Sequence, residues 1–183
     1  EMLRSLVGSE MCIRDSTNAV DAFEALNRKE VRTLFNKYGI FNDVEVAARY
    51  RIYLTDYCQT VNIEARTALS IAKTCILPRA MSYQGDLAIK ANALGTLSCG
   101  KIQLKKIKTL EKYISDFDKA IDELEVATKT AQATSDLKEK AVACRDLIIP
   151  KLDSLRVIAD EMELICDKNV WGRPNYQDIL FRD

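Results

Sequence analysis

The sequence predicts an all-α protein: an antiparallel bundle of three long helices, with short N-terminal helices and an extended C-terminal tail. Only 6 Gly and 3 Pro occur among 183 residues, which leaves few positions for turns and favours long helices over many short strands. Apolar residues also recur at helical spacing along three long stretches. Hydrophobic residues make up 48% of the chain and charged residues 30%, a balance typical of a soluble globular domain with a sizeable core.

The clearest periodicity runs from residue 107 to residue 131. Consecutive a and d positions of a heptad pattern are apolar there, with a single threonine as the exception. Burying one large apolar side chain stabilises a fold by ~1.5–3 kcal/mol, so this apolar row is expected to face a partner helix. Its members are Ile107, Leu110, Ile114, Phe117, Ile121, Leu124, Thr128 and Ala131.

An earlier long helix is predicted from Asn42, which can form a capping box with Glu45. Helix-compatible residues continue to about Leu94, and Pro78 is expected to kink the helix because it removes a backbone donor. The apolar row of this helix is Ala47, Tyr50, Leu54, Tyr57 and Val61.

The last long helix is predicted after Asp136 and Glu139, which can cap it, and Pro150 is expected to bend it. Short turns between three such helices predict antiparallel packing. The apolar row of the last helix is Leu137, Ala141, Cys144, Ile148, Leu152, Leu155, Ala159, Met162 and Cys166.

Shorter segments flank these helices. Residues 17–27 and 30–38 have helical patterns, and Gly39 stands where a left-handed C-cap belongs. The tail, residues 169–183, has more apolar surface than a solvated terminus should expose. We expect it to dock on the chain's own helices, the alternative being other parts of a larger assembly. Its apolar residues are Trp171, Tyr176, Ile179, Leu180 and Phe181.

Residues 1–16 have no clear helical or strand period, and residues 5–16, SLVGSEMCIRDS, resemble translated adapter sequence. We therefore expect this segment to be non-native, and a natural disordered arm is the alternative.

Composition argues against several kinds of chemistry. The chain has no histidine, which removes His-based acid–base catalysis and the commonest zinc ligand. Neither GxxxxGK[ST] nor GxGxxG occurs. The 27 basic and 27 acidic residues balance, so no charge excess points to nucleic acid or a membrane surface. The six cysteines form no CxxC pair and predict free thiols in a reducing, cytoplasmic compartment: Cys12, Cys58, Cys75, Cys99, Cys144 and Cys166.

Three charged groups could still mark a site. The carboxylates of Asp21, Glu24 and residues 119–129 are helically spaced and could ligate a metal, but we interpret them as a solvated helix face. A small basic cluster at a helix start is interpreted in the same way rather than as a nucleic-acid surface. It comprises Lys101, Lys105, Lys106 and Lys108.

Glu64 lies among apolar residues in VNIEA. We interpret it as a buried structural carboxylate paired with Arg49, Arg66 or Arg145. The residues therefore assign no catalytic, cofactor-binding or metal-binding position.

Several motifs in order resemble the C-terminal region of type III glutamine synthetases, over about residues 17–183. They are LFNKYGIFNDVEVAARY (34–50), YCQTVNIEA (57–65), ILP (76–78), RDLIIPKLDSLRVIADEME (145–163), WGRPNYQDILF (171–181) and, more weakly, VDAFEAL (20–26). Two positions depart from the family pattern: Gly172 stands where proline is usual, and Arg66 where an apolar residue is usual.

The resemblance implies a parent enzyme that condenses glutamate and ammonia, using ATP and Mg²⁺ or Mn²⁺, through a γ-glutamyl phosphate. The family's catalytic motifs lie upstream, so no catalytic residue is carried over and this region is expected to be structural, with no cofactor of its own. Its expected partners are the catalytic domain of the same chain and the other subunits of a homo-oligomer, with no nucleic acid and no membrane.

The expected organisation is a non-native segment (1–16), the end of the catalytic domain (17–41), the long-helix bundle (42–168) and the docked tail (169–183). A free-standing helical-bundle or coiled-coil interaction module is the alternative function.

Overall fold

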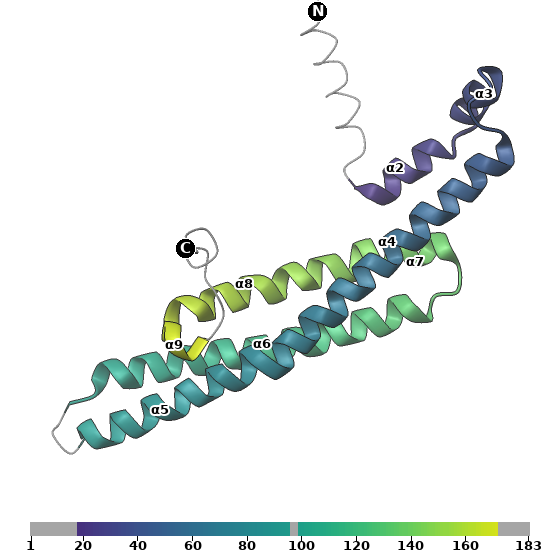
Figure 1. The fold of residues 1–183 in the computed structure, drawn as a ribbon. Coiled ribbons are helices and arrows are strands. Elements are labelled where there is room, and N and C mark those ends of the chain that lie inside the picture. The colour runs from purple at the N-terminus through teal and green to yellow at the C-terminus, as the bar shows by residue number, and fades with distance from the viewer. Residues whose placement is uncertain (1–17, 96–98, 172–183) are drawn as a thin grey trace, which may run out of the picture. The chain divides into compact units, whose positions relative to one another are not determined.

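A computed structural model describes residues 18–95 and 99–171, and most of these residues are helical, with no strand among them (Figure 1). The predicted all-α class is confirmed. The chain divides into two units. The first takes in residues up to Ile63 together with Lys129–Leu147, and the second takes in Glu64–Thr128 and the residues from Ile148 onward.

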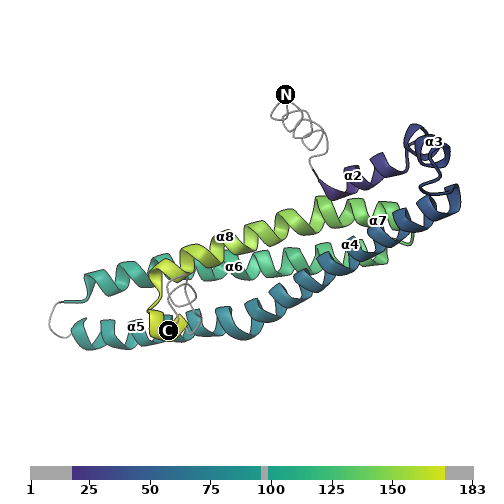
Figure 2. The same ribbon diagram turned by 45° about the horizontal axis from the view of Figure 1, so that its top comes forward.

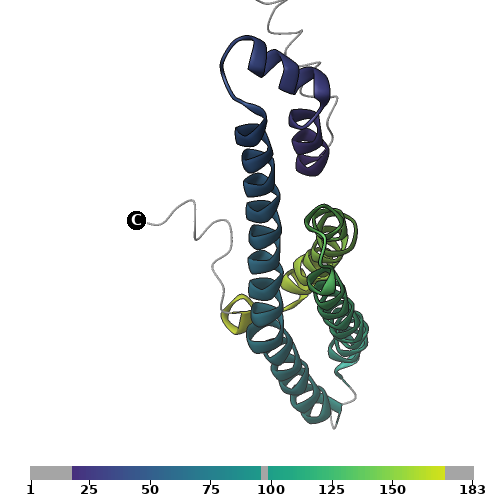
Figure 3. The same cartoon turned by 90° about the vertical axis from the view of Figure 1, so that its right-hand side faces the viewer.

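The first unit contains two short helices, α2 (Ala19–Leu26) and α3 (Lys29–Lys37), followed by the first part of α4 (Asp43–Ile71). It also holds the end of α6 (Lys101–Ala133) and α7 (Leu137–Ala143). Figure 3 shows α2 and α3 folded back beside the first turns of α4.

Local capping explains that reversal. Gly39 adopts φ 64°, a left-handed conformation that costs glycine little. Asn42 and Glu45 form the predicted capping box, because each backbone N–H donates to the other's side chain, at 2.8 and 2.9 Å. The boundary between α3 and α4 is therefore encoded in neighbouring residues.

The second unit contains the rest of α4, a π-helix η1 (Ala72–Ile76), α5 (Leu77–Gly95), most of α6, α8 (Ile149–Ile165) and the short α9 (Lys168–Trp171). Gln84 of α5 donates to Glu111 of α6 at 2.6 Å. Lys73, which comes earlier in the chain, pairs with Glu125, which comes later, also at 2.6 Å. The pairing is therefore antiparallel, and Figure 2 shows α5 beside α6.

The contacts between α6 and α8 run in the same sense. Lys151 pairs with Glu123 at 2.6 Å, and Tyr113 donates to Glu161 at 3.4 Å. Antiparallel packing thus holds for both helix pairs of the second unit, whereas a single bundle over residues 42–168 stays a prediction.

Both prolines that were expected to bend helices follow a π-helix. η1 ends at Ile76, two residues before Pro78, and η2 (Cys144–Ile148) ends two residues before Pro150. A π-turn holds one extra residue, so its bonding pattern can absorb the donor that proline lacks without ending the helix. The structure therefore continues each helix through a widened turn.

The predicted apolar rows form the core. In the α6 row, Ile107 and Ile114 are half-buried and the other six members are buried. The one polar member, Thr128, donates its hydroxyl to the Leu124 carbonyl at 2.7 Å, which satisfies the buried group. The rows of the first and last long helices contain no exposed member. Periodicity therefore predicted which faces are buried.

The tail begins differently from the prediction, because residues 168–171 form the helix α9 instead of an extended segment. α9 contacts α5. Trp171 is 7% exposed, and its carbonyl accepts a bond of 2.6 Å from Arg79 of α5. Trp171 thus lies against the chain's own helix, as expected. The other apolar tail residues and Gly172 lie outside the described residues, as do residues 1–16.

Ile121→Asp should unfold the chain, because Ile121 is 2% exposed within the α6 row. Removing a buried isoleucine costs ~2–5 kcal/mol, and the substitution also buries an unpaired charge. Ile114→Asp should act in the same direction. Lys119→Asp on the outer face, where the side chain is 71% exposed, is the control and should change stability far less. Equal melting temperatures by circular dichroism for the three variants would contradict the assigned row.

The single tryptophan reports on α9. Trp171 emission should be blue-shifted, as for an indole shielded from water. Arg79→Ala removes the donor to the Trp171 carbonyl and should shift the emission to the red. Arg156→Ala, which alters an arginine with a 71% exposed side chain, should leave the spectrum unchanged. A solvent-like spectrum of the unaltered chain would show that α9 does not dock in solution.

Candidate functional site: the α2 clamp

The strongest concentration of side-chain interactions in the first unit surrounds α2. Asn18 caps this helix: its side chain accepts from the Asp21 N–H at 3.0 Å and donates to the Asp21 carboxylate at 2.8 Å. A helix of eight residues is marginal by itself in water. Its conformation must therefore depend on packing against α4 and α7.

Apolar contacts supply the first part of that packing. Val20 is 1% exposed. The Phe23 ring stacks on Tyr53, with centroids 5.5 Å apart and planes at 18°, and meets Tyr57 edge-on at 6.4 Å. Such aromatic pairs contribute about 0.5–1.5 kcal/mol beyond the area they bury. Phe23 is thus the apolar anchor of α2 on α4.

Glu24 supplies the second part. Its carboxylate accepts a hydrogen bond from the Tyr50 hydroxyl of α4 and pairs with Lys138 of α7 at 3.0 Å. The bond from Tyr50, with a further contribution from Lys138, lowers the pKa of Glu24 below its ordinary value of 4.5. Burial, and then the bond to Glu24, raises the pKa of Tyr50 to about 12. At neutral pH the carboxylate is therefore charged and the phenol protonated.

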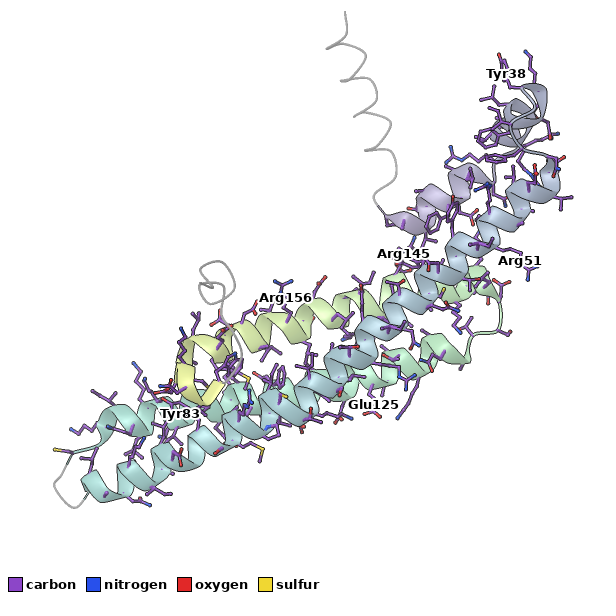
Figure 4. All side chains as sticks on the ribbon, in the orientation of Figure 1. Tyr38, Arg51, Tyr83, Glu125, Arg145 and Arg156 are labelled. Atoms are coloured by element: carbon purple, nitrogen blue, oxygen red, sulfur yellow. The ribbon has the colours of Figure 1, made fainter. Side chains whose placement is uncertain are left out.

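Arg145, which follows α7, supplies the third part. Its guanidinium pairs with Asp21 at 3.1 Å and with its neighbour Asp146 at 2.6 Å, and Figure 4 shows the Arg145 side chain beside α2. The hydrogen bond from Arg145 lowers the pKa of Asp146. We call this whole arrangement the α2 clamp; its members are Val20, Asp21, Phe23, Glu24, Tyr50, Tyr53, Tyr57, Lys138 and Arg145.

The clamp connects helices to one another, and its charged groups form ion pairs and hydrogen bonds with each other. Among residues 18–95 and 99–171, no group of three or more acidic or cysteine side chains is placed to hold a metal ion. Two buried thiols of the same unit, Cys58 and Cys144, contact each other. Burial raises the pKa of both, that of Cys144 to about 11, so they remain protonated and weakly nucleophilic at neutral pH.

The structure adds contacts to one interpretation of the carboxylates and contradicts another. Asp21 is exposed, as expected of a solvated face, and also pairs with Arg145, whereas Glu24 is half-buried and pairs with Lys138. Glu64 is exposed, because its neighbour Ala65 faces the core and successive helical residues point about 100° apart. Its expected partner Arg145 serves Asp21 instead.

The other arginines, carboxylates and lysines considered as candidates make structural contacts or are exposed to solvent. Arg49 lies over the Phe41 ring, with its guanidinium carbon 4.3 Å from the centroid, and Arg66 is exposed. Within residues 119–129, Glu123 and Glu125 pair with lysines of other elements of the second unit. The four lysines of the basic cluster are exposed on the first turns of α6.

Sequence reasoning missed the clamp, although one signal for it was present. Tyr50, Tyr53 and Tyr57 are spaced by three and four residues, so they share one side of α4. An aromatic row of this kind requires an apolar partner, and Phe23 is that partner. The polar contacts gave no such signal, because their partners lie far apart in sequence.

No helix in the described part of the chain is both long enough and apolar enough to cross a membrane.

Comparison with known proteins identifies relatives. Residues 12–94 match the family model described as glutamine synthetase C-terminal domain. The chain is 28% identical over 151 residues to a glutamine synthetase of Butyrivibrio fibrisolvens. The aligned region covers 81% of this chain and 22% of that protein. It is 29% identical over 184 residues to the glutamine synthetase of Bacteroides fragilis, covering 94% and 25%.

A third relative is the type-3 glutamine synthetase of Dictyostelium discoideum, 23% identical over 168 residues, with 88% of this chain and 23% of that protein covered. The chain therefore spans between 22% and 25% of the length of these three curated relatives.

Glu24→Gln should destabilise the chain and weaken the dependence of its melting temperature on acidic pH. A carboxylate whose pKa is lowered by folding contributes stability above its ordinary pKa of 4.5, and this contribution is lost as pH falls through the lower folded value. Between about pH 7 and about pH 3, the melting temperature of the unaltered chain should therefore fall further than that of the variant. Glu64→Gln, at an exposed position, is the matched control. Indistinguishable curves for all three proteins would show that Glu24 does not stabilise the fold.

Proposed function

We propose that this chain, which is similar to the C-terminal part of longer glutamine synthetases, is the structural, non-catalytic helical region of such an enzyme. The parent enzyme would be of type III and would make glutamine from glutamate, ammonia and ATP. In that enzyme the helical region would stabilise the fold and support contacts between subunits.

The observation that carries the proposal is the α2 clamp. α2 is too short to be stable alone, yet one aromatic anchor and two sets of charged contacts attach it to α4 and to residues 138–145. In the longer relatives, most of the polypeptide is additional to the matched part. A fixed junction at α2 would hold that polypeptide at a defined position against the helical region.

The cofactors and partners follow from the same premise. We assign ATP and Mg²⁺ or Mn²⁺ to the remainder of the parent enzyme, and we assign no cofactor-binding residue to this region. The proposed partners are the catalytic part of the same chain and the neighbouring subunits of a homo-oligomer in the cytoplasm. The proposal includes no nucleic-acid or membrane partner.

The alternative is a free-standing helical interaction module. The long apolar row of α6 would suit either function, because it needs only partner helices. The family match favours the first.

Two experiments test the proposal. The purified chain should form no glutamine from glutamate, ammonia and ATP above a no-protein control, because the clamp's charged groups are occupied by each other. Removing the matching C-terminal part from the Bacteroides fragilis relative should reduce both oligomer assembly, measured by light scattering, and glutamine formation. Activity of the isolated chain would contradict the non-catalytic role, and an unimpaired truncated enzyme would contradict the structural one.

A further inference from the structure

The corner between α3 and α4 exposes four large apolar side chains. Leu34 is 50% exposed, Tyr38 66%, Ile40 53% and Val44 78%. Leu34 and Tyr38 lie one turn apart, Ile40 follows the reversal at Gly39, and Val44 is in the first turn of α4. We call these four residues the corner patch, and Figure 4 labels Tyr38 within it. Clustered apolar exposure of this kind marks interaction surfaces.

Two capping motifs fix the backbone beneath the patch. At the end of α3, the Gly39 N–H donates to the Asn36 carbonyl at 3.2 Å, and the Ile40 N–H donates to the Phe35 carbonyl at 2.9 Å. This is the Schellman arrangement, and the Asn42–Glu45 capping box follows directly. The patch residues are thus presented from an ordered turn, which lowers the entropy lost on binding.

Side chains beneath the corner stiffen it further. The Phe35 and Phe41 rings pack edge to face, with centroids 5.5 Å apart. Arg49 lies over the Phe41 ring, and Arg32 pairs with Asp43 at 3.2 Å. Arg32 and Asp43 therefore pair with each other, and an apolar surface that covers the patch leaves neither of these two charges unpaired. The exposed Lys37 amine lies 5.7 Å from the Tyr38 ring centroid.

Apolar side chains presented from an ordered turn favour an apolar, permanently attached partner over an acidic or transient one. Two occupants have that chemistry: a second copy of this chain, and the polypeptide that precedes this region in the longer relatives. The patch and the α2 clamp lie in the same unit, and α2 is where the preceding polypeptide would join it. Covalent attachment at that junction gives the preceding polypeptide a high effective concentration at the patch.

We propose that the corner patch is the surface on which the upstream, catalytic part of the same longer chain packs. The inference rests on the proposed function and adds the location of the contact: residues 34–44, at the turn between α3 and α4. The patch then occupies in the parent enzyme the position of an internal domain interface, whose apolar side chains are exposed only when the helical region stands alone.

The test compares two double variants. Ile40→Asp with Val44→Asp alters the patch, and Ile89→Asp with Ile102→Asp alters side chains on α5 and α6 that are 70% and 73% exposed. In the isolated chain neither pair should change the melting temperature appreciably, because all four residues are exposed. In the full-length enzyme that carries this region, the patch pair should reduce glutamine formation about tenfold or more, as loss of an interface anchor does. The control pair should not.

A photo-crosslinking residue placed at Tyr38 in the same enzyme identifies the occupant. A crosslink to upstream residues of the same subunit is expected. A crosslink to this region of another subunit would assign the patch to a second copy and overturn the inference, as would a patch variant with full activity. An enzyme that still requires its helical region for assembly but gives no crosslink at Tyr38 would overturn the inference alone. The proposed function would stand in that case.

Discussion

Burial of one side of α6 is the constraint on which most of the described chain depends. The helix runs without a break from Lys101 to Ala133 and contributes residues to both units. Its apolar row is too large to leave in water, so other helices must cover it. In the second unit, contacts from η1, α5 and α8 reach α6 from two sides, and charged pairs such as Lys73–Glu125 and Lys151–Glu123 lie at the edges of those contacts. The pairs are exposed and contribute little energy, so they are compatible with the antiparallel register and do not determine it.

The sequence could predict whatever depends on near neighbours. Helical periodicity located the buried rows, and the capping residues Asn42 and Asp136 located two helix starts, because such signals are complete within a few positions. Pro78 and Pro150 showed where a backbone donor is missing. The two prolines did not show how the missing donor is compensated, because either a kink or a π-turn can accommodate a missing backbone N–H. The all-α class followed from these local signals.

The candidate site was harder to predict, because its partners are remote. Arg145 was considered for Glu64 and instead meets Asp21, which lies far away in the sequence. Nothing in the composition of either segment distinguishes these pairings; the rotation of α4 about its axis does, since it turns Ala65 inward and Glu64 outward. Long charged side chains can reach several neighbours, so the choice among them is made by tertiary packing. Aromatic packing could be predicted more readily from the sequence, because the spacing of Tyr50, Tyr53 and Tyr57 places them on one helix face.

The clamp and the corner patch differ in one respect that bears on function. Around α2, carboxylates, a phenol, an amine and a guanidinium are paired with each other, so this surface is complete within the chain. At the turn between α3 and α4, Arg32 pairs with Asp43, but four apolar side chains remain exposed. The two capping motifs stabilise the ends of α3 and α4, whereas the exposure of four large apolar side chains at the same turn contributes nothing to stability. In the first unit, the charged contacts around α2 are therefore made within the chain, whereas residues 34–44 expose apolar side chains. That difference is why we propose the turn, and not α2, as the surface that the preceding polypeptide covers.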